Sequence, residues 1–352
     1  MRARRFLAGT VVMGGVLVGL PATAVAQTLV PCNAAALQSA VVAANTAGGG
    51  TLNLSPACTY SLTTPVGGED GLAAITTPIR INGNRATITR SSASLFRFFN
   101  VAGTGDLTLN ALTLSGGRAS NGGAIFVSVG GRLTLTASTV TGNTATSVGG
   151  GAILNQGSTV MIDSSTLSNN TGGQGGAFNN QGNGATTFTN SVVTGNHGTG
   201  GVATSAGGGI VVLNGSVTLN GTRLAGNDAT GPNAFGGALT NAGTLNLTGS
   251  PVLNNIVNGS DASGGGVWSS GTLNITNSQV LGNTATGTNA RGGGILTGGT
   301  TTLQGVAVIT NQAVGTGADG GGIVRTGGTV TLTSTTVAAN QPNNCSNVTG
   351  CP

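Results

Sequence analysis

Few side chains in this sequence could carry out acid–base, nucleophilic or metal chemistry. Its 352 residues include one His, no Lys and seven acidic residues. The acidic residues are Glu69, Asp70, Asp106, Asp163, Asp228, Asp261 and Asp319. Glycoside hydrolysis needs two carboxyl groups about 5–9.5 Å apart, so the question is which of these groups the fold brings together.

Glu69 and Asp70 are adjacent in the sequence. An acidic pair in a loop could bind Ca²⁺ through its oxygen atoms, and the alternative is a solvated turn. The single histidine, His197, stands between Asn196 and Gly198. No Ser or Asp partner is expected around it, so we predict a loop histidine and no catalytic triad.

One oppositely charged pair shares a position in a repeat. Arg291 and Asp319 each stand immediately before a Gly triplet, so we expect them to be stacked neighbours about 5 Å apart at the backbone. They could form an exposed ion pair of small energy or anchor a charged sugar. Asp261 is expected two coils from Asp319 in a different loop register, and Asp228 is expected beside Ile256. No second carboxylate is therefore predicted to converge on either acid.

Arg291 and Asp319 each precede a copy of a motif that returns eight times at a spacing of about 28 residues. The motif is Gly-Gly followed by a small residue and then an apolar residue. The apolar residues are Ile125, Ile153, Phe178, Ile210, Leu239, Val267, Ile295 and Ile323. A period in this range indicates a solenoid, in which each repeat stacks on the next to bury its apolar face. The repeats occupy residues 122–340, and residues 27–121 are predicted to form an N-terminal cap and the first coils.

Period-2 alternation predicts three short strands per repeat, with aliphatic side chains inward and Thr, Ser and Asn outward. Three strands per turn make a triangular coil, and parallel crossovers are right-handed in nearly all proteins. We therefore predict an all-β fold, a right-handed parallel β-helix solenoid of about eleven coils. A short amphipathic helix over residues 33–47, with Asn33 as its N-cap, is predicted to cap the N-terminal end.

An Asn recurs at one position of every repeat. The set is Asn143, Asn170, Asn196, Asn227, Asn255, Asn283, Asn311 and Asn340. An amide both donates and accepts hydrogen bonds, so stacked copies are predicted to form a ladder. A column of Ser or Thr five residues earlier, broken at Val306, is predicted to have the same turn-forming role.

The position after the inward apolar residue forms another column. It holds Phe126, Leu154, Asn179, Val211, Thr240, Trp268, Leu296 and Val324. Strict alternation would place these side chains outward, where an apolar strip around Trp268 could bind a partner or a glycan. The alternative is that the variable loops cover them and that they only pack.

Residues 1–26 are predicted to be a signal peptide. Arg2, Arg4 and Arg5 precede the apolar run 6–20, and Ala24-Val25-Ala26 fits a cleavage site; the general and twin-arginine export routes both stay open. Nine scattered Arg then oppose seven acids, so nucleic-acid binding is not predicted. No later apolar run reaches the ~20 residues that span a bilayer.

Export favours disulfides for the four cysteines. Four cysteines allow three pairings, and the local choice joins Cys32 to Cys58 and Cys345 to Cys351, the latter in a tail over residues 341–352. These pairs would lie at opposite ends of a solenoid, which argues against one shared metal site.

Two groups of motifs carry a family resemblance. The segments 37–45, 49–54 and 59–62 resemble the N-terminal cap of secreted bacterial β-helix proteins of the pectate-lyase-like superfamily. Gly122-Gly123-Ala124-Ile125 resembles the GGAI element of the polymorphic outer-membrane protein family, whereas Val140-Thr141-Gly142-Asn143 departs from its FxxN element by having Val in place of Phe. The resemblance implies a β-helix, export and an adhesive role.

We predict a secreted or envelope-associated β-helix that acts as a structural or adhesive surface-interaction protein, with no catalytic site, metal or cofactor. The alternative is a polysaccharide-active lyase or hydrolase, or a carbohydrate-binding module. A glycan or a cell-surface protein is the expected partner. The candidate ligand-binding residues are Trp268, Arg291, Asp319 and Asp261.

Overall fold

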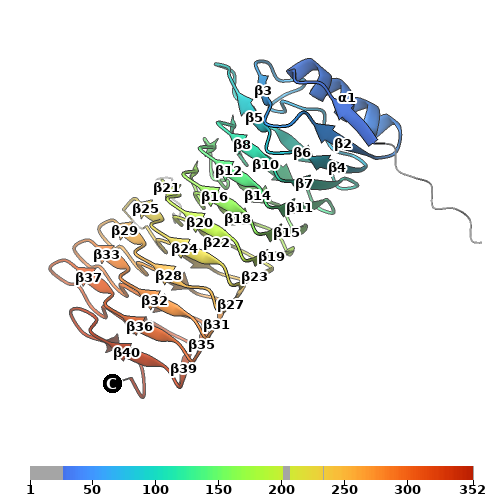
Figure 1. Cartoon of the computed structure of the whole chain (residues 1–352). Helices are drawn as coiled ribbons and strands as arrows, with labels where there is room; N and C mark the ends of the chain where they lie inside the picture. The colour runs from blue at the N-terminus through green and yellow to red at the C-terminus, as the bar shows by residue number, and fades with distance from the viewer. Residues whose placement is uncertain (1–26, 201–206, 233, 352) are drawn as a thin grey trace, which may run out of the picture.

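The computed structural model describes residues 27–200, 207–232 and 234–351, and the predicted signal peptide lies outside them. The described chain forms an elongated stack of parallel coils, with helix α1 (Ala34–Thr46) at one end and the C-terminus at the other (Figure 1). The parallel β-solenoid of about eleven coils is confirmed.

Each complete coil contributes one strand to each of four parallel sheets, named here A to D in the order in which the chain visits them. Sheet A is composed of β1 (Gln27–Val30), β2 (Gly50–Leu54), β4 (Pro78–Asn82), β7 (Asp106–Asn110), β11 (Arg132–Thr136), β15 (Thr159–Asp163), β19 (Ala185–Thr189), β23 (Ser216–Asn220), β27 (Thr244–Thr248), β31 (Thr272–Thr276), β35 (Thr300–Gln304) and β39 (Thr329–Thr333). Sheet B is composed of β3 (Thr59–Leu62), β5 (Thr87–Arg90), β8 (Thr113–Ser115), β12 (Thr139–Thr141), β16 (Thr166–Ser168), β20 (Val192–Thr194), β24 (Arg223–Ala225), β28 (Val252–Leu253), β32 (Gln279–Leu281), β36 (Ala307–Ile309) and β40 (Thr336–Ala338).

The other two sheets have shorter strands. Sheet C is composed of β9 (Arg118–Ala119), β13 (Thr144–Ala145), β17 (Thr171–Gly172), β21 (His197–Gly198), β25 (Asp228–Thr230), β29 (Ile256–Asn258), β33 (Thr284–Thr286) and β37 (Gln312–Val314). Sheet D is composed of β6 (Phe99–Val101), β10 (Ile125–Val127), β14 (Ile153–Asn155), β18 (Phe178–Asn180), β22 (Ile210–Val212), β26 (Leu239–Asn241), β30 (Val267–Ser269), β34 (Ile295–Thr297), β38 (Ile323–Arg325) and β41 (Cys345–Ser346).

The prediction of three strands per coil is wrong, because sheet C was not anticipated. From β13 onward its strands begin directly after the ladder Asn, and all of them are only two or three residues long, too short for an alternating pattern to be recognised. They protrude along one edge of the molecule (Figure 1). Toward the C-terminus they cover a second, small apolar core, which contains Ala229, Ala234, Val257, Ala262, Ala285, Ala290 and Ala313.

The Gly pair of each repeat lies where the chain returns from sheet C to sheet D. A Cβ on Gly265 would lie 2.3 Å from the carbonyl oxygen of Gly293 and 2.5 Å from the carbonyl carbon of Thr284. Only glycine lets two backbones approach this closely. The recurrence of Gly at this place therefore follows from the backbone crossing.

The Asn column forms a continuous buried ladder. Every Nδ2 from Asn143 to Asn311 donates to the Oδ1 of the next ladder residue at 2.9 Å. The same Oδ1 accepts the backbone N–H of the preceding Asn, for example Asn227 N to Asn255 Oδ1 at 2.9 Å. The Ser column bonds similarly, since the backbone N–H of Ser138 donates to Ser165 Oγ at 3.1 Å. Both columns satisfy buried polar groups at the corners of the coil.

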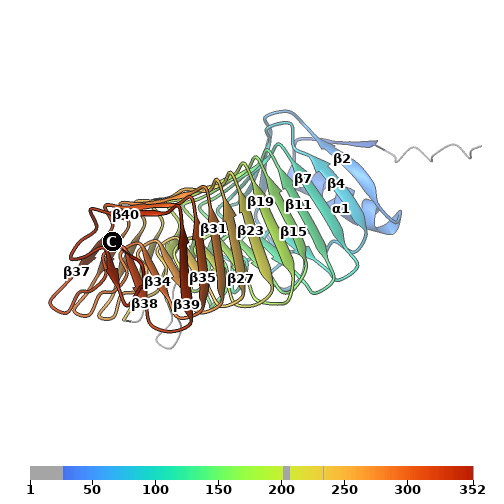
Figure 2. The ribbon, with the colours of Figure 1, turned by 90° about the horizontal axis from the view of Figure 1, so that it is seen from below.

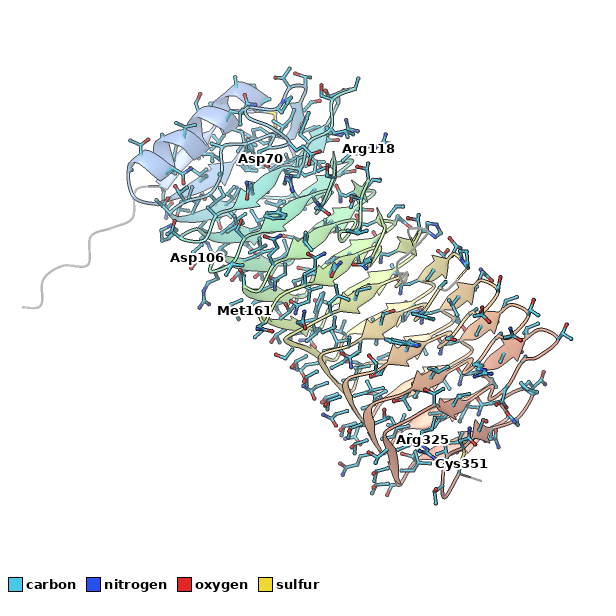
Figure 3. The ribbon with its side chains drawn as sticks, turned by 180° about the vertical axis from the view of Figure 1, so that it is seen from behind. Asp70, Asp106, Arg118, Met161, Arg325 and Cys351 are labelled. Carbon is cyan, nitrogen blue, oxygen red and sulfur yellow. A yellow bond between two sulfur atoms is a disulfide. The ribbon has the colours of Figure 1, made fainter. Side chains whose placement is uncertain are left out.

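The ends of the solenoid differ. Helix α1 buries Leu37, Val41 and Ala44 against the first coils, and the Asn33 side chain accepts a hydrogen bond from Ala36 N, as predicted. The disulfides Cys32–Cys58 and Cys345–Cys351 secure opposite ends, and Figure 3 shows Cys351 at the end away from α1. In the described chain, no helix is both long and apolar enough to cross a membrane.

Candidate functional site

Two columns of outward positions run side by side along the C-terminal half of the solenoid. The first column, immediately before the Gly pair, pairs Phe235 with Ser263, Ser263 with Arg291, and Arg291 with Asp319. The second column, in sheet D, holds Thr240, Trp268, Leu296 and Val324 in direct register. The columns are adjacent, because Thr240 Oγ1 donates to the carbonyl oxygen of Phe235 at 2.9 Å. We call the strip that they form the trough.

The trough contains an aromatic pair. The rings of Phe235 and Trp268 are stacked with centroids 4.9 Å apart and planes at 8°, and both side chains are half-buried. Elsewhere in the second column Leu154, Val211 and Leu296 are buried. The two interpretations of this column therefore hold at different places: most of its side chains are buried, whereas Phe126 and Trp268 stay partly exposed.

A polar pocket of about 320 Å³ lies beside the first column and is lined by Asp261, Ser263, Asn289 and Arg291. Asn289 Nδ2 donates to Asp261 Oδ1 at 3.0 Å, which fixes the carboxylate at the pocket wall. Arg291 is exposed, and among the described residues nothing accepts a hydrogen bond from its guanidinium. The pocket thus offers a carboxylate, an amide, a hydroxyl and a free guanidinium to a polar ligand.

Arg291 and Asp319 are stacked neighbours at the backbone, as predicted, but their side chains do not form an ion pair within the described chain. Asp319 instead interacts with the C-terminal tail, where Asn343 Nδ2 donates to its Oδ1 at 3.2 Å. The hydroxyl of Ser346 is the main cause that lowers the pKa of Asp319; Asn343 and the Gly320 amide contribute, and the charge of Arg291 contributes least. The structure therefore places Arg291 and Asp261 at one pocket and leaves Asp319 outside it.

The acidic pair Glu69–Asp70 is not a solvated turn. Arg97 donates from Nε to Asp70 Oδ1 at 2.9 Å and from Nη2 to Glu69 Oε2 at 3.1 Å. Ser120 and Asn100 bind the remaining carboxylate oxygens. Since protein donors already occupy these oxygens, the cluster fixes a loop to the first coils and offers little to Ca²⁺. Figure 3 shows Asp70 near the end that carries α1.

The prediction that His197 has no acidic partner is wrong. His197 in β21 and Asp228 in β25 are direct neighbours in sheet C, and His197 Nδ1 lies 2.5 Å from Asp228 Oδ2. This hydrogen bond is the main cause that raises the pKa of His197, against a lowering effect of burial. On its other side His197 pairs with Thr171, and Asp228 pairs with Ile256 as predicted.

The described side chains do not form a metal centre, because no group of three or more His, Cys, Asp or Glu is close enough to hold an ion. The arrangement is instead suited to binding: an accessible aromatic pair next to a small polar pocket, on a rigid parallel scaffold. Ligand sites commonly combine apolar surface with a few convergent polar groups in this way.

Comparison with solved structures found two similar chains, both of low sequence identity. The A-module of mannuronan C-5 epimerase AlgE6 from Azotobacter vinelandii is 18% identical, with a TM-score of 0.38 over 87% of this chain and 95% of that one. The A-module of AlgE4 from the same organism is 16% identical, with a TM-score of 0.39 over 90% and 96%. At these values the modules bear on neither the ligand nor the chemistry of this protein. No family model and no curated protein matches the sequence, so the resemblance to the polymorphic outer-membrane protein repeats is not confirmed.

Proposed function

We propose that this protein is a secreted, non-catalytic glycan-binding β-helix that acts as an adhesive surface module, with its ligand in the trough. The observation that carries the proposal is the position of the Phe235–Trp268 pair next to the pocket of Asp261 and Arg291. The two disulfides agree with an oxidising, extracellular location.

The chemistry of the trough suits a sugar chain. The apolar face of a sugar ring packs on aromatic side chains, and its hydroxyl groups bind carboxylate, amide and guanidinium groups. Trp268 lies in the same coil as Asp261 and Ser263 and one coil before Arg291, a step of about 5 Å along the solenoid axis at the spacing of neighbouring strands. One residue of a glycan chain could therefore stack on Trp268 while the next enters the pocket.

The test is a panel of acidic and neutral polysaccharides, mixed with the mature protein with and without Ca²⁺. Size-exclusion chromatography would report co-elution and glycan chain length. For a bound polysaccharide, Trp268→Ala should weaken affinity about tenfold or more, as expected for a central aromatic contact, and Trp268→Phe should restore part of it. Arg291→Ala should also weaken binding, whereas Arg223→Ala, an exposed arginine on sheet B, serves as the matched control.

Retained affinity in both Trp268→Ala and Arg291→Ala would refute the trough as the binding site. Thermal unfolding of each variant separates lost binding from lost folding. Absence of co-elution with every polysaccharide would refute glycan binding for the panel and favour a cell-surface protein partner.

A polysaccharide-active enzyme is the second candidate, and the His197–Asp228 pair favours it. An imidazole held by a carboxylate is the usual form of a general base. Against it, no other carboxylate converges on this pair among the described residues. Shortened glycan chains in the same chromatograms, abolished by His197→Ala, would replace the proposal of a non-catalytic protein.

A further inference from the structure

The outer face of sheet A changes character along the molecule. In β7, β11 and β15 its outward positions include Asp106, Arg132, Asp163 and the 45% exposed Met161, and Figure 3 shows Asp106 and Met161 along the same side of the molecule. From β23 to β39 no outward position holds a charged or aromatic residue. The outward residues there are Ser216, Thr218, Asn220, Thr244, Asn246, Thr248, Thr272, Asn274, Thr276, Thr300, Thr302, Gln304, Thr329, Thr331 and Thr333. We call this surface the threonine face.

The threonine face is a regular two-dimensional array. Its five strands pair residue for residue with no shift in register, and they lie side by side in Figure 2. Neighbouring side chains are therefore separated by about 4.7–4.9 Å across the strands and about 6.6 Å along them. The inward side chains of the same strands, such as Leu245, Leu247 and Leu273, are fully buried, which holds the array rigid.

The hydroxyl groups of this face are free. Within the described chain, none of its threonine hydroxyls makes a hydrogen bond to protein. Sheet B differs, since Thr194 Oγ1 donates to the carbonyl oxygen of Ala225 at 2.8 Å and Ser168 Oγ to Thr141 Oγ1 at 3.0 Å. The central column of the threonine face is ordered by Asn274 Nδ2, which donates to Asn246 Oδ1 at 2.9 Å.

We propose that the threonine face binds the surface of ice. Ice presents rows of water oxygens at spacings close to those of neighbouring strands and alternate residues, so many threonine hydroxyls can bond to lattice water at once. Each bond is weak, but their simultaneous formation on a rigid array makes the sum large. Threonine methyl groups fill the spaces between water rows, and the absence of charge matters because an ion keeps its own hydration shell.

The features of the face distinguish this ligand from the one proposed for the trough. The threonine face has no aromatic side chain for a sugar ring and no charged group for an acidic polymer. It is also flat and extends over five strands, whereas the trough is a narrow strip on sheet D. The two sites can therefore be tested independently on one molecule.

The test grows an ice shell slowly from a dilute solution of the mature protein and measures the protein in ice against that in liquid. We expect enrichment in ice relative to a non-binding reference protein. Thr302→Lys, in the central column of the face, should lower this enrichment about tenfold, because a charge in the contact would have to be desolvated. Thr139→Lys, on the outer face of sheet B, is the matched control and should retain enrichment, as should Trp268→Ala.

Three results would overturn the proposal. The first is that the wild-type protein enters ice no more than the reference protein does. The second is that Thr302→Lys and Thr139→Lys lose ice enrichment equally while their thermal unfolding is unchanged. The third is that the wild-type protein is not enriched in ice but binds microcrystalline cellulose, and that Thr302→Lys abolishes this binding. That result would assign the face to a crystalline polysaccharide. Because Trp268→Ala leaves this face intact, failure of the trough proposal and failure of this one give different results.

Discussion

The two halves of this solenoid share one backbone and use their side chains differently. In residues 27–200, charged groups bind each other: Arg97 joins Glu69 and Asp70, and Arg132 lies 3.8 Å from Asp106. In residues 207–351, polar groups are left open, as at the pocket of Asp261 and Arg291 and along the threonine face. The Arg97 cluster thus holds a loop of the N-terminal half in place, whereas the C-terminal half carries the two surfaces that we propose bind ligands.

A second difference lies in sheet C. Its strands are two residues long from β9 to β21 and three residues long from β25 to β37. The longer strands bury the alanine-rich second core, which supports the segment that carries Phe235, Ser263 and Arg291. The sheet C strands of these coils, each one residue longer, therefore support one wall of the trough.

The largest expected effect concerns the Gly pair of the repeats, which both halves of the solenoid contain. Gly265→Ala should destabilise the protein by more than about 4 kcal/mol, because its Cβ would overlap the backbone of Gly293 and Thr284. Gly123→Ala in the N-terminal half should cost as much, since its Cβ would lie 2.4 Å from Gly151 O and 2.5 Å from Thr144 O. Urea unfolding followed by circular dichroism measures both.

The control for these variants is Gly226→Ala. Gly226 has a φ of 61° but nothing within 4 Å of its Cβ position, so only backbone strain of about 1 kcal/mol is expected. A similar loss of stability in Gly226→Ala and Gly265→Ala would show that strain, and not the backbone crossing, explains the Gly pair.

The intermediate effect tests the N-terminal half alone. Arg97→Ala should cost about 2–3 kcal/mol, because it leaves two half-buried carboxylates without their cation; the Arg97 side chain is only 12% exposed. Arg132→Ala should cost less than about 0.5 kcal/mol, since both partners of that pair are more than 40% exposed. Thermal unfolding midpoints of the two variants measure the difference. Equal midpoints would show that Arg97 does not stabilise the N-terminal half more than Arg132 does.

The sequence predicts contacts between residues that occupy the same position in successive repeats. The Asn ladder and the stacking of Arg291 on Asp319 follow from equal positions in successive repeats, and both are in the structure. The His197–Asp228 neighbours could have been found in the same way, because each residue directly follows a ladder Asn. They were missed because a two-residue strand gives no alternating pattern, so the segment was interpreted as a loop.

Contacts outside the repeat could not be predicted. The Arg97 cluster depends on the path of the non-repeating segment around Glu69, and the Phe235–Trp268 stack depends on side-chain torsions that bring residues of neighbouring coils together. Neither has a counterpart in other repeats. Recurrence therefore reveals the scaffold of the trough, whereas the aromatic contact that makes it a candidate site is specific to one pair of coils.

The smallest expected effect concerns the junction of the two halves, where His197 meets Asp228. Because Asp228 raises the pKa of His197 in the folded protein, the pair stabilises the fold fully below the unfolded pKa of His, about 6.5. This stabilisation is lost as the pH rises through the folded pKa. With side chains 34% and 37% exposed, solvent screening limits it to about 0.5 kcal/mol.

Since His197 is the only histidine in the sequence, its imidazole proton resonances can be followed by NMR without ambiguity. We expect the wild type to titrate above an unperturbed histidine and Asp228→Asn to return the pKa toward the ordinary value. The stability difference between these two proteins should be greater at pH 5.5 than at pH 8. An unchanged titration in Asp228→Asn would mean that the charge of His197 does not depend on its neighbour, and the interpretation of this pair as a general base would lose its basis.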